Sequence, residues 1–254
     1  MTQYFETPQG RRLAYRRSGA DLSGAGLVWL SGFNSDMQGS KVLALEAWAA
    51  GQDHPFLAFD YSGHGMSDGD FADGTISAWR EDSLAAIDAL TEGPQILVGS
   101  SMGGWMALLA ALARPERIAG LILIAPAPDF TETLMWPEFS PAVQQEIIET
   151  GVHMRPSDYG EPYPITRALI EDGRQWQILD APIAFTGPVR ILQGMDDPDV
   201  PWIHAQRLVN ALTSPDLIFT LIKDGDHRLS REQDIARLLS TAGEIVRAAS
   251  QSLP

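Results

Sequence analysis

Short apolar runs alternate with helix-like stretches along most of this chain, and this alternation restricts the fold more than any other feature. Six runs are predicted as strands: Leu27–Ser31, Phe56–Asp60, Gln95–Gly99, Leu121–Ala125, Val189–Gln193 and Leu217–Ile222. They are apolar throughout, which is typical of strands covered on both faces. Helices are expected between them, at Ser40–Ala50, Ser77–Leu90, Met102–Ala113, Ile203–Leu212 and Glu232–Ala249. The pattern predicts an α/β fold with a mostly parallel central sheet and helices on both faces.

One long segment interrupts the alternation. Residues 128–188 contain no convincing buried strand, are rich in proline and aromatic residues, and look helical near Pro141–Thr150 and Ile165–Gly173. About sixty residues are too many for a plain loop in a compact domain. We expect a helical lid, or cap, inserted over the carboxyl ends of the strands into a core formed by residues 1–127 and 189–254. The alternative is a helical excursion that only packs against the sheet edge.

The N-terminal residues predict a hairpin and not a targeting segment. Tyr4–Glu6 and Arg11–Arg16 flank Gln9-Gly10, a pattern that favours an antiparallel hairpin at the edge of the sheet. The opening stretch MTQYFETPQGRR has no apolar region and is not the arginine-rich, acid-poor helix of a transit peptide. We therefore expect a cytoplasmic protein.

The charge balance excludes several classes of partner. The chain has 33 acidic and 18 basic residues, a formal net charge of −15. A nucleic acid backbone needs a basic face, and so does an anionic membrane surface. No window holds the ~18 uninterrupted apolar residues of a membrane span. Cysteine is absent, which excludes disulfides and thiolate catalysis. We expect a small-molecule or acylated-protein substrate, and the oligomeric state stays open.

The strongest motif is Gly99-Ser100-Ser101-Met102-Gly103, which follows a predicted strand and precedes a predicted helix. This is the G-x-S-x-G nucleophile elbow in the strand–turn–helix context that it requires. The turn lifts the Ser101 hydroxyl out of the sheet and directs the first amides of the helix at the same point. Those amides can hold an oxyanion, and Met102 would supply one of them.

A serine nucleophile needs a base, and His227 is the best candidate among the five histidines. In folds with this elbow, the serine, the acid and the histidine follow in that order along the chain. His54 and His64 precede Ser101, so they are excluded as the base. His153 lies in the insertion and His204 begins a helix, whereas His227 directly follows the last apolar strand. A loop there opens at the edge where Ser101 emerges.

The acid should lie on the loop after the preceding strand, where three aspartates compete. Asp197 stands three residues after Gly194 and three before Val200-Pro201, in a G-x-x-D-x-x-V-P pattern. A carboxylate there fixes the imidazole tautomer and stabilises the imidazolium. Asp196 and Asp199 are expected to be solvated or to bind local amides.

Two positions are expected to complete the site. The second oxyanion donor should be a backbone N–H after the Leu27–Ser31 strand. Phe33 is the first choice, with its ring lining the pocket, and Gly32 or Asn34 are alternatives. In the lid, Trp136 and its neighbour Met135 are candidates to line an acyl pocket, although such residues are more often core.

No cluster of histidine and carboxylate residues suggests a metal site, and no cofactor is expected.

Along the chain, the hairpin, the nucleophile elbow, the long insertion, the G-x-x-D-x-x-V-P loop and the final Asp-His follow one another in an order that resembles that of the α/β-hydrolase superfamily. The resemblance covers nearly the whole chain. The stretches GPQILVGSSMGGWMALLAALARPERI, QGMDDPDVPW and DHR most resemble its branch of mitochondrial palmitoyl-protein thioesterases, also known as mycophenolic acyl-glucuronide esterases, and we expect a bacterial relative. The resemblance implies a serine esterase or thioesterase, of acyl-thioester or acyl-glucuronide type, that works through an acyl-serine intermediate on Ser101, Asp197 and His227. The chain departs from the superfamily at Gln193, where a His-Gly pair is common.

Rival hypotheses share the same residues. Members of this superfamily with the same triad cleave carbon–carbon bonds or amides, and fold alone does not decide the substrate. A serine at the elbow disfavours dehalogenase and epoxide hydrolase chemistry, which need aspartate there. A non-catalytic ligand-binding protein on the same scaffold is the other alternative, which an intact triad disfavours.

Overall fold

The structure is a computed structural model, and it describes residues 1–19, 24–157 and 160–252. Its strands are β1 (Gln3–Glu6), β2 (Arg12–Ser18), β3 (Gly26–Leu30), β4 (Phe56–Phe59), β5 (Gln95–Ser100), β6 (Ile118–Ile124), β7 (Val152–Ser157), β8 (Gly160–Thr166), β9 (Val189–Gly194) and β10 (Leu217–Ile222). Its α-helices are α1 (Ser40–Gly51), α2 (Ile76–Leu90), α3 (Met102–Ala113), α4 (Trp136–Glu138), α5 (Pro141–Thr150), α6 (Arg167–Arg174), α7 (Trp202–Ala211) and α8 (Glu232–Ser252). A 3₁₀ turn covers Phe71–Asp73 and a π-helical turn covers Thr131–Met135.

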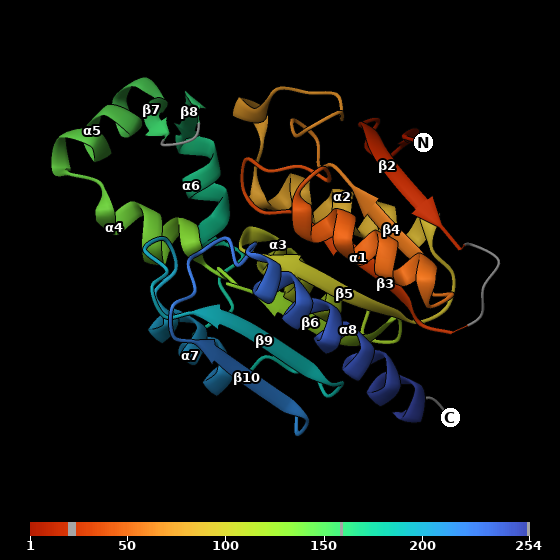
Figure 1. The fold of residues 1–254 in the computed structure, drawn as a ribbon. Coiled ribbons are helices and arrows are strands. Elements are labelled where there is room, and N and C mark those ends of the chain that lie inside the picture. Colours follow the sequence, from red (N-terminus) through yellow and green to blue (C-terminus); the bar gives the residue numbers. More distant parts are fainter. Residues whose placement is uncertain (20–23, 158–159, 253–254) are drawn as a thin grey trace.

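Eight strands form one central sheet in the order β1-β2-β4-β3-β5-β6-β9-β10. The six strands from β4 to β10 pair in parallel, while β1 and β2 add an antiparallel hairpin at one edge. Each predicted strand is present within a few residues of its expected bounds. The α/β-hydrolase arrangement of a mostly parallel sheet is therefore confirmed. It brings the loops after β3, β5, β9 and β10 to one edge (Figure 1).

Helices cover both faces of the sheet, and each face has its own core. On one face, α1 and α8 contact each other and pack Leu45 and Leu238 against the sheet. On the other face, α2, α3 and α7 bury Trp79, Trp105 and Leu208. The helix α3 lies under the middle of the sheet, and ten of its twelve residues are buried. Its almost fully apolar sequence follows from this central position.

The segment between β6 and β9 differs in part from the expected helical insertion. The helix α5 has its predicted bounds, but α6 begins at Arg167, so Ile165 belongs to β8. The strands β7 and β8 form a separate antiparallel pair. Sequence analysis missed this hairpin because Ile165 alone is buried among the positions whose burial the structure describes, and Pro156 and Pro164 interrupt any strand pattern. The division into core and cap stays a prediction, and residues 20–23, 158–159 and 253–254 of its ranges lie outside the described residues.

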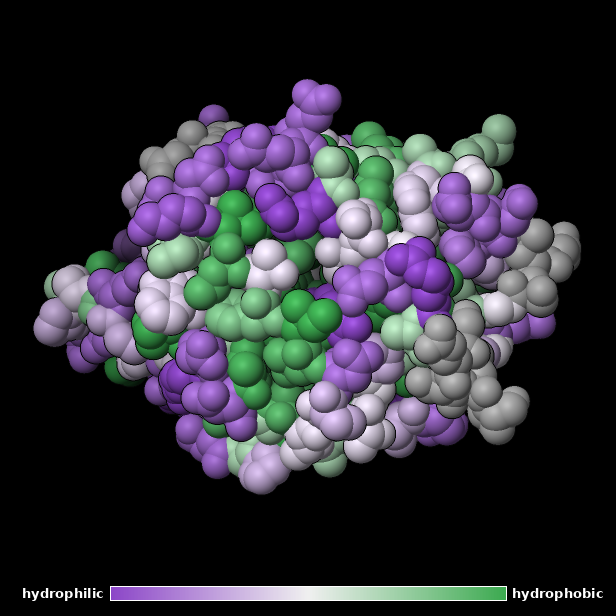
Figure 2. Space-filling view, turned by 60° about the horizontal axis from the view of Figure 1, so that its bottom comes forward, coloured by the Kyte–Doolittle hydropathy of each residue, from purple (hydrophilic) through white to green (hydrophobic). Residues whose placement is uncertain are grey.

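The other edge of the sheet is β10. Figure 2 brings the lower side of Figure 1 forward, and apolar surface gathers near the middle of that face with polar residues around it. The strand β10 and the helix α7, which lie at the bottom of Figure 1, have the exposed apolar side chains Ile218, Leu221 and Ile203. Among the described residues, no helix has the length and hydropathy of a membrane span.

Candidate active site

Ser101 lies on the turn between β5 and α3, in a backbone conformation that residues other than glycine rarely adopt. Its φ is 56° and its ψ is −119°, and such strain persists only where the surrounding structure imposes it. A Cβ on Gly99 would lie 2.3 Å from the Gly103 carbonyl oxygen, and a Cβ on Gly103 would lie 2.0 Å from that of Leu30. The glycines of the motif therefore let strand, turn and helix pack in direct contact.

His227 connects Ser101 with Asp197 through both of its ring nitrogens. Nε2 lies 3.1 Å from Ser101 Oγ, and Nδ1 lies 2.9 Å from Asp197 Oδ2. A proton on Nδ1, donated to the carboxylate, leaves the lone pair of Nε2 directed at the serine hydroxyl. The loops after β5, β9 and β10 thus bring the three predicted residues into one hydrogen-bonded chain.

The Asp197 carboxylate is buried, and four donors surround it. Its side chain is 0% exposed. Oδ1 accepts hydrogen bonds from the backbone N–H groups of Asp199 at 2.9 Å and Val200 at 2.8 Å. Oδ2 accepts from His227 and from Gln193 Nε2, the latter at 3.0 Å. These bonds fix the direction in which the carboxylate faces the imidazole.

Gln193 is a site residue to which sequence analysis gave no role. Besides Asp197, its Nε2 donates to the carbonyl oxygens of Gly194 at 3.1 Å and Val200 at 3.0 Å. The amide orientation is settled by these acceptors, because a flipped amide would set Oε1 against three oxygens. The available signal was a polar side chain at the end of an apolar strand, one residue before the G-x-x-D loop.

Two glycines join the loop of Asp197 to the loop of His227. A Cβ on Gly194 would lie 2.3 Å from the Gly225 carbonyl oxygen. That oxygen accepts a hydrogen bond from the backbone N–H of Asp196 at 2.9 Å. The side chain of Asp196 is exposed, so this competitor for the acid position lies away from the imidazole. Acid and base are therefore carried by two loops in backbone contact.

The loop after β3 passes beside Ser101. A Cβ on Gly32 would lie 3.4 Å from Ser101 Cβ. Among residues 1–19, 24–157 and 160–252, no hydrogen-bond partner is found for the backbone N–H of Phe33 or of Met102. Met102 is the first residue of α3, so its N–H belongs to the positive end of that helix. The alternative donor Asn34 has a φ of 51°. Both first-choice amides are left available to a ligand atom.

A cavity of about 390 Å³ opens beside Ser101 and His227. From the core, Phe33, Ala127 and Val200 line it, and from the insertion Phe130, Leu134, Met135, Arg155 and Tyr163. The Phe33 ring packs against the rings of Phe130 at 5.6 Å and Tyr163 at 5.9 Å. The wall therefore combines residues of both parts of the chain, and apolar side chains lie beside charged ones such as Glu138 and Arg155. The insertion lies above this edge of the sheet in Figure 1.

Trp136 does not line that cavity, contrary to its predicted substrate role. Its ring packs edge-on against Phe139, and the Arg174 guanidinium lies 5.5 Å from the ring centre. The π-helical turn before α4 directs Leu134 and Met135 toward the cavity, which leaves the next residue on the other side. Met135, the second candidate, is a wall residue.

Ser101 and His227 also border a smaller cavity of about 200 Å³ on the side of α1. Its wall includes Ser35, Asp36, Lys41 and Arg228. Sequence analysis missed Lys41 because nothing local relates the first turn of α1 to a loop 187 positions later.

Two further histidines are buried and take no part in this chain of residues. The His64 ring lies among the rings of Tyr61, Phe71 and Trp79 and is 4% exposed. Burial lowers the pKa of His64 to about 4, and its Nδ1 donates to the Ser62 carbonyl oxygen at 3.2 Å.

His204 fixes the start of the insertion. Its Nε2 lies 2.8 Å from the Pro128 carbonyl oxygen, and burial lowers the pKa of the imidazole. A neutral ring that donates from Nε2 suits this contact. The ring of His204 is thus engaged with the Pro128 carbonyl oxygen, whereas the imidazole that contacts Ser101 is that of His227.

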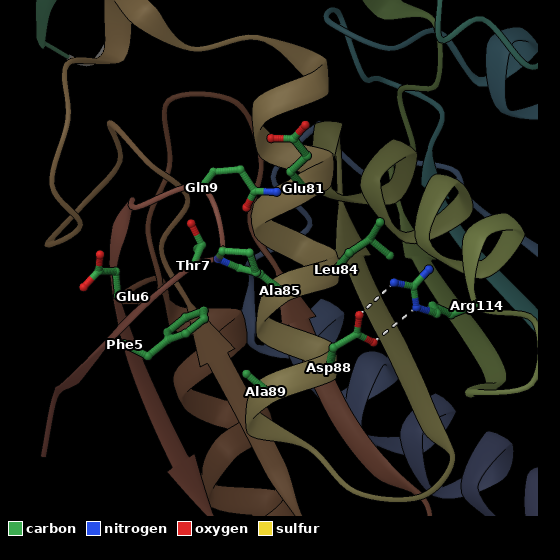
Figure 3. Close-up of a pocket in the computed structure, with 11 residues that line it drawn as sticks. Phe5, Glu6, Thr7, Gln9, Glu81, Leu84, Ala85, Asp88, Ala89 and Arg114 are labelled. Atoms are coloured by element: carbon green, nitrogen blue, oxygen red, sulfur yellow. Dashed lines mark hydrogen bonds and ion pairs between the residues drawn. The ribbon is translucent and has the colours of Figure 1, made fainter.

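The largest of these cavities lies elsewhere. A hollow of about 580 Å³ separates the N-terminal hairpin from α2, and the ion pair between Asp88 and Arg114 borders it (Figure 3). None of Ser101, Asp197 and His227 lines it. Size alone therefore does not identify the reactive site here.

One group of side chains within the described residues has the spacing of metal ligands. Ligand atoms of Asp197, Asp199 and His227 all lie within 4.8 Å of one another. The facing atoms of Asp197 and His227 are already hydrogen-bonded to each other. An ion would have to break that bond, so the arrangement suits an acid–base pair better than a metal centre.

Comparisons with known proteins agree over nearly the full chain. Residues 22–241 match the Alpha/beta hydrolase family. The chain is 39% identical to the mitochondrial palmitoyl-protein thioesterase ABHD10 of Mus musculus, over 95% of this chain and 81% of that protein. It is 36% identical to the Homo sapiens protein of the same name, over 96% and 79% of the two chains.

Solved structures give the same picture. A protein from Agrobacterium vitis S4, named only as a hydrolase, has a TM-score of 0.93 and 43% identity, with 97% and 98% of the two chains covered. Alpha/beta hydrolase domain-containing protein 10 from mouse has a TM-score of 0.87 and 38% identity, with the same coverage. The similarity thus includes the insertion as well as the sheet.

Proposed function

Because the chain belongs to the alpha/beta hydrolase family, we propose that it is a serine hydrolase that cleaves carboxylic esters or thioesters. The observation that carries the proposal is the bridging position of His227, 3.1 Å from Ser101 Oγ and 2.9 Å from Asp197 Oδ2. A hydroxyl is a weak nucleophile at neutral pH unless a base takes its proton. The similarity to palmitoyl-protein thioesterases favours an acyl thioester as the substrate.

In the proposed mechanism, His227 Nε2 takes the Ser101 proton as Oγ bonds to the acyl carbon. The N–H groups of Met102 and Phe33 hold the resulting oxyanion. His227 then gives the proton to the departing alcohol or thiol as its bond to the acyl carbon breaks, which leaves an acyl-serine. A water molecule, deprotonated by the same imidazole, releases the acid. Each oxyanion donor contributes on the order of 3 kcal/mol to the barrier reduction.

The test compares the wild type with Ser101→Ala on p-nitrophenyl esters from acetyl to palmitoyl and on a palmitoyl-thioester probe. We expect kcat to fall at least about a thousandfold, because the nucleophile is lost while the fold is kept. Ser240→Ala, an exposed serine of α8, is the matched control and should keep wild-type activity. Equal turnover by wild type and Ser101→Ala would overturn the assignment.

A fluorophosphonate label separates the rival functions. A wild type that is labelled at Ser101 but turns over neither esters nor thioesters would move the proposal to amides or carbon–carbon bonds. A wild type that is neither labelled nor active would favour a ligand-binding protein on this scaffold.

A further inference from the structure

The smaller cavity beside Ser101 has a chemical character of its own. It shares Phe33, Ser101 and His227 with the larger cavity, so both open on the same hydroxyl. Five serines border it, whereas the larger one has the apolar side chains of Phe130, Leu134 and Met135 on its wall, which suit an acyl chain. Once an acyl chain fills the larger cavity, the group on the other side of the scissile bond is directed to the smaller one.

The charges at the two cavities have opposite signs. Lys41 and Arg228 line the smaller cavity against one carboxylate, Asp36, a balance of about one positive charge. The larger cavity has Arg155 against Glu138 and Asp199, a balance of about one negative charge. The chain as a whole has a net charge of −15, so a positively charged cavity at the nucleophile has the opposite sign to the protein around it.

Lys41 and Arg228 are close enough to affect each other. Lys41 Nζ donates a hydrogen bond to the Arg228 carbonyl oxygen, which connects α1 to the loop of His227. Burial and the charge of Arg228 lower the pKa of Lys41 to about 8, against the opposing effects of Asp226, Asp234 and Asp197. An anion between two such cations would relieve their repulsion. Gly39 and Ser40, at the positive end of α1, border the same cavity.

Resting on the proposed function, we propose that the smaller cavity is the leaving-group subsite and that Lys41 and Arg228 bind an anionic group there. The preferred substrates are then acyl esters or thioesters whose alcohol or thiol part bears a carboxylate or a phosphate. His227, which borders the subsite, returns the proton to the departing oxygen or sulfur.

Matched pairs of thioesters test this assignment. One pair is S-butanoyl-N-acetylcysteine and its methylamide, which differ by a carboxylate. The other is S-butanoyl-4′-phosphopantetheine and S-butanoylpantetheine, which differ by a phosphate. In wild type we expect kcat/KM for at least one anionic member to exceed that of its neutral partner about tenfold, and this ratio to shrink as salt is added. The pair with the larger ratio identifies the anion.

Substitutions test whether Lys41 and Arg228 cause the preference for anionic thioesters. Lys41→Met and Arg228→Gln should each lower the anionic-to-neutral ratio about fivefold or more, and Lys41→Arg should restore most of it. Lys223→Met is the matched control, because Lys223 is the other lysine of the chain and does not line the cavity. Its ratio should equal that of wild type.

The outcomes keep the two proposals apart. Neutral thioesters cleaved in a Ser101-dependent manner, with ratios near one in wild type, would overturn the anionic subsite and leave the hydrolase proposal standing. If neither member of either pair is cleaved, the hydrolase proposal itself loses its support. Ratios that Lys41→Met and Arg228→Gln leave unchanged would also overturn the subsite.

Discussion

The two parts of the chain that meet at Ser101 are held in place by different means. On the sheet side, backbone touches backbone: a Cβ on Gly103 would lie 2.0 Å from the Leu30 carbonyl oxygen. On the insertion side, side chains provide the attachment, through buried apolar packing and hydrogen bonds. Ser77 of α2 bonds to Asp172 and Trp176, and Trp105 of α3 donates to the Trp176 carbonyl oxygen at 3.2 Å.

This difference suggests a division of labour. The loops of Ser101, Asp197 and His227 are packed too closely to change their conformation. Catalysis requires this, because the reacting groups must keep a fixed geometry. The insertion contributes cavity wall through Leu134, Met135 and Tyr163, which can change without moving the imidazole. We therefore expect substitutions on the sheet side to affect rate and folding, and those on the insertion side to affect substrate choice.

The largest expected effect is on the sheet side, at the acid. Asp197→Asn should lower kcat by about 10⁴-fold with little change of fold, because an amide no longer holds the imidazole in the required tautomer. Steady-state kinetics with circular dichroism would measure both. Asp196→Asn, one residue away and exposed, should stay within a few-fold of wild type. A similar loss in both variants would mean that the loop, and not the carboxylate, is what matters.

The next effect compares the two modes of attachment directly. Gly103→Ala should lower the free energy of unfolding by about 3 kcal/mol, because its Cβ meets backbone that cannot yield. Ser77→Ala loses two side-chain hydrogen bonds and should cost about 1–2 kcal/mol. Urea titration would rank them. Gly51→Ala, with open space around the new Cβ, should be nearly neutral; the comparison fails if Gly103→Ala resembles it.

The smallest effect should be on chain-length preference. Leu134→Trp adds volume at the cavity wall, so the ratio of kcat/KM for palmitoyl over butanoyl esters should fall about tenfold. Trp136→Ala, one residue away and outside the cavity, should change this ratio less than twofold. A larger shift from Trp136→Ala would show that the predicted substrate role of that residue was right after all.

The inner strands of the sheet were predictable because they are buried on both faces, so local composition alone locates Phe56–Phe59 or Val189–Gly194. The meeting of Ser101 and His227 followed from the same reasoning, since loops after parallel strands share one edge. Their chemical roles stay predictions, as does the cellular location. The hairpin of β7 and β8 was missed because its strands are only partly buried and contain proline. Gln193 was missed because the sequence does not reveal how the following loop turns back to bring Asp197 and Val200 to its amide. Lys41 was missed because its partner lies 187 positions away.

The buried ring of His64 ties the stability of the sheet side to proton uptake. Its pKa of about 4 in the folded chain lies below the ordinary value of 6.5. Between pH 4 and pH 6.5, the imidazole therefore binds a proton in the unfolded chain but not in the folded chain. Stability from this ring is complete above pH 6.5 and falls by on the order of 3 kcal/mol as the pH drops to 4. Asp60 and Asp129, whose carboxyl pKa values burial raises, oppose the loss, because their folded forms take up protons first. Acid would thus act on the aromatic packing around His64, a group that the proposed chemistry at Ser101 does not use.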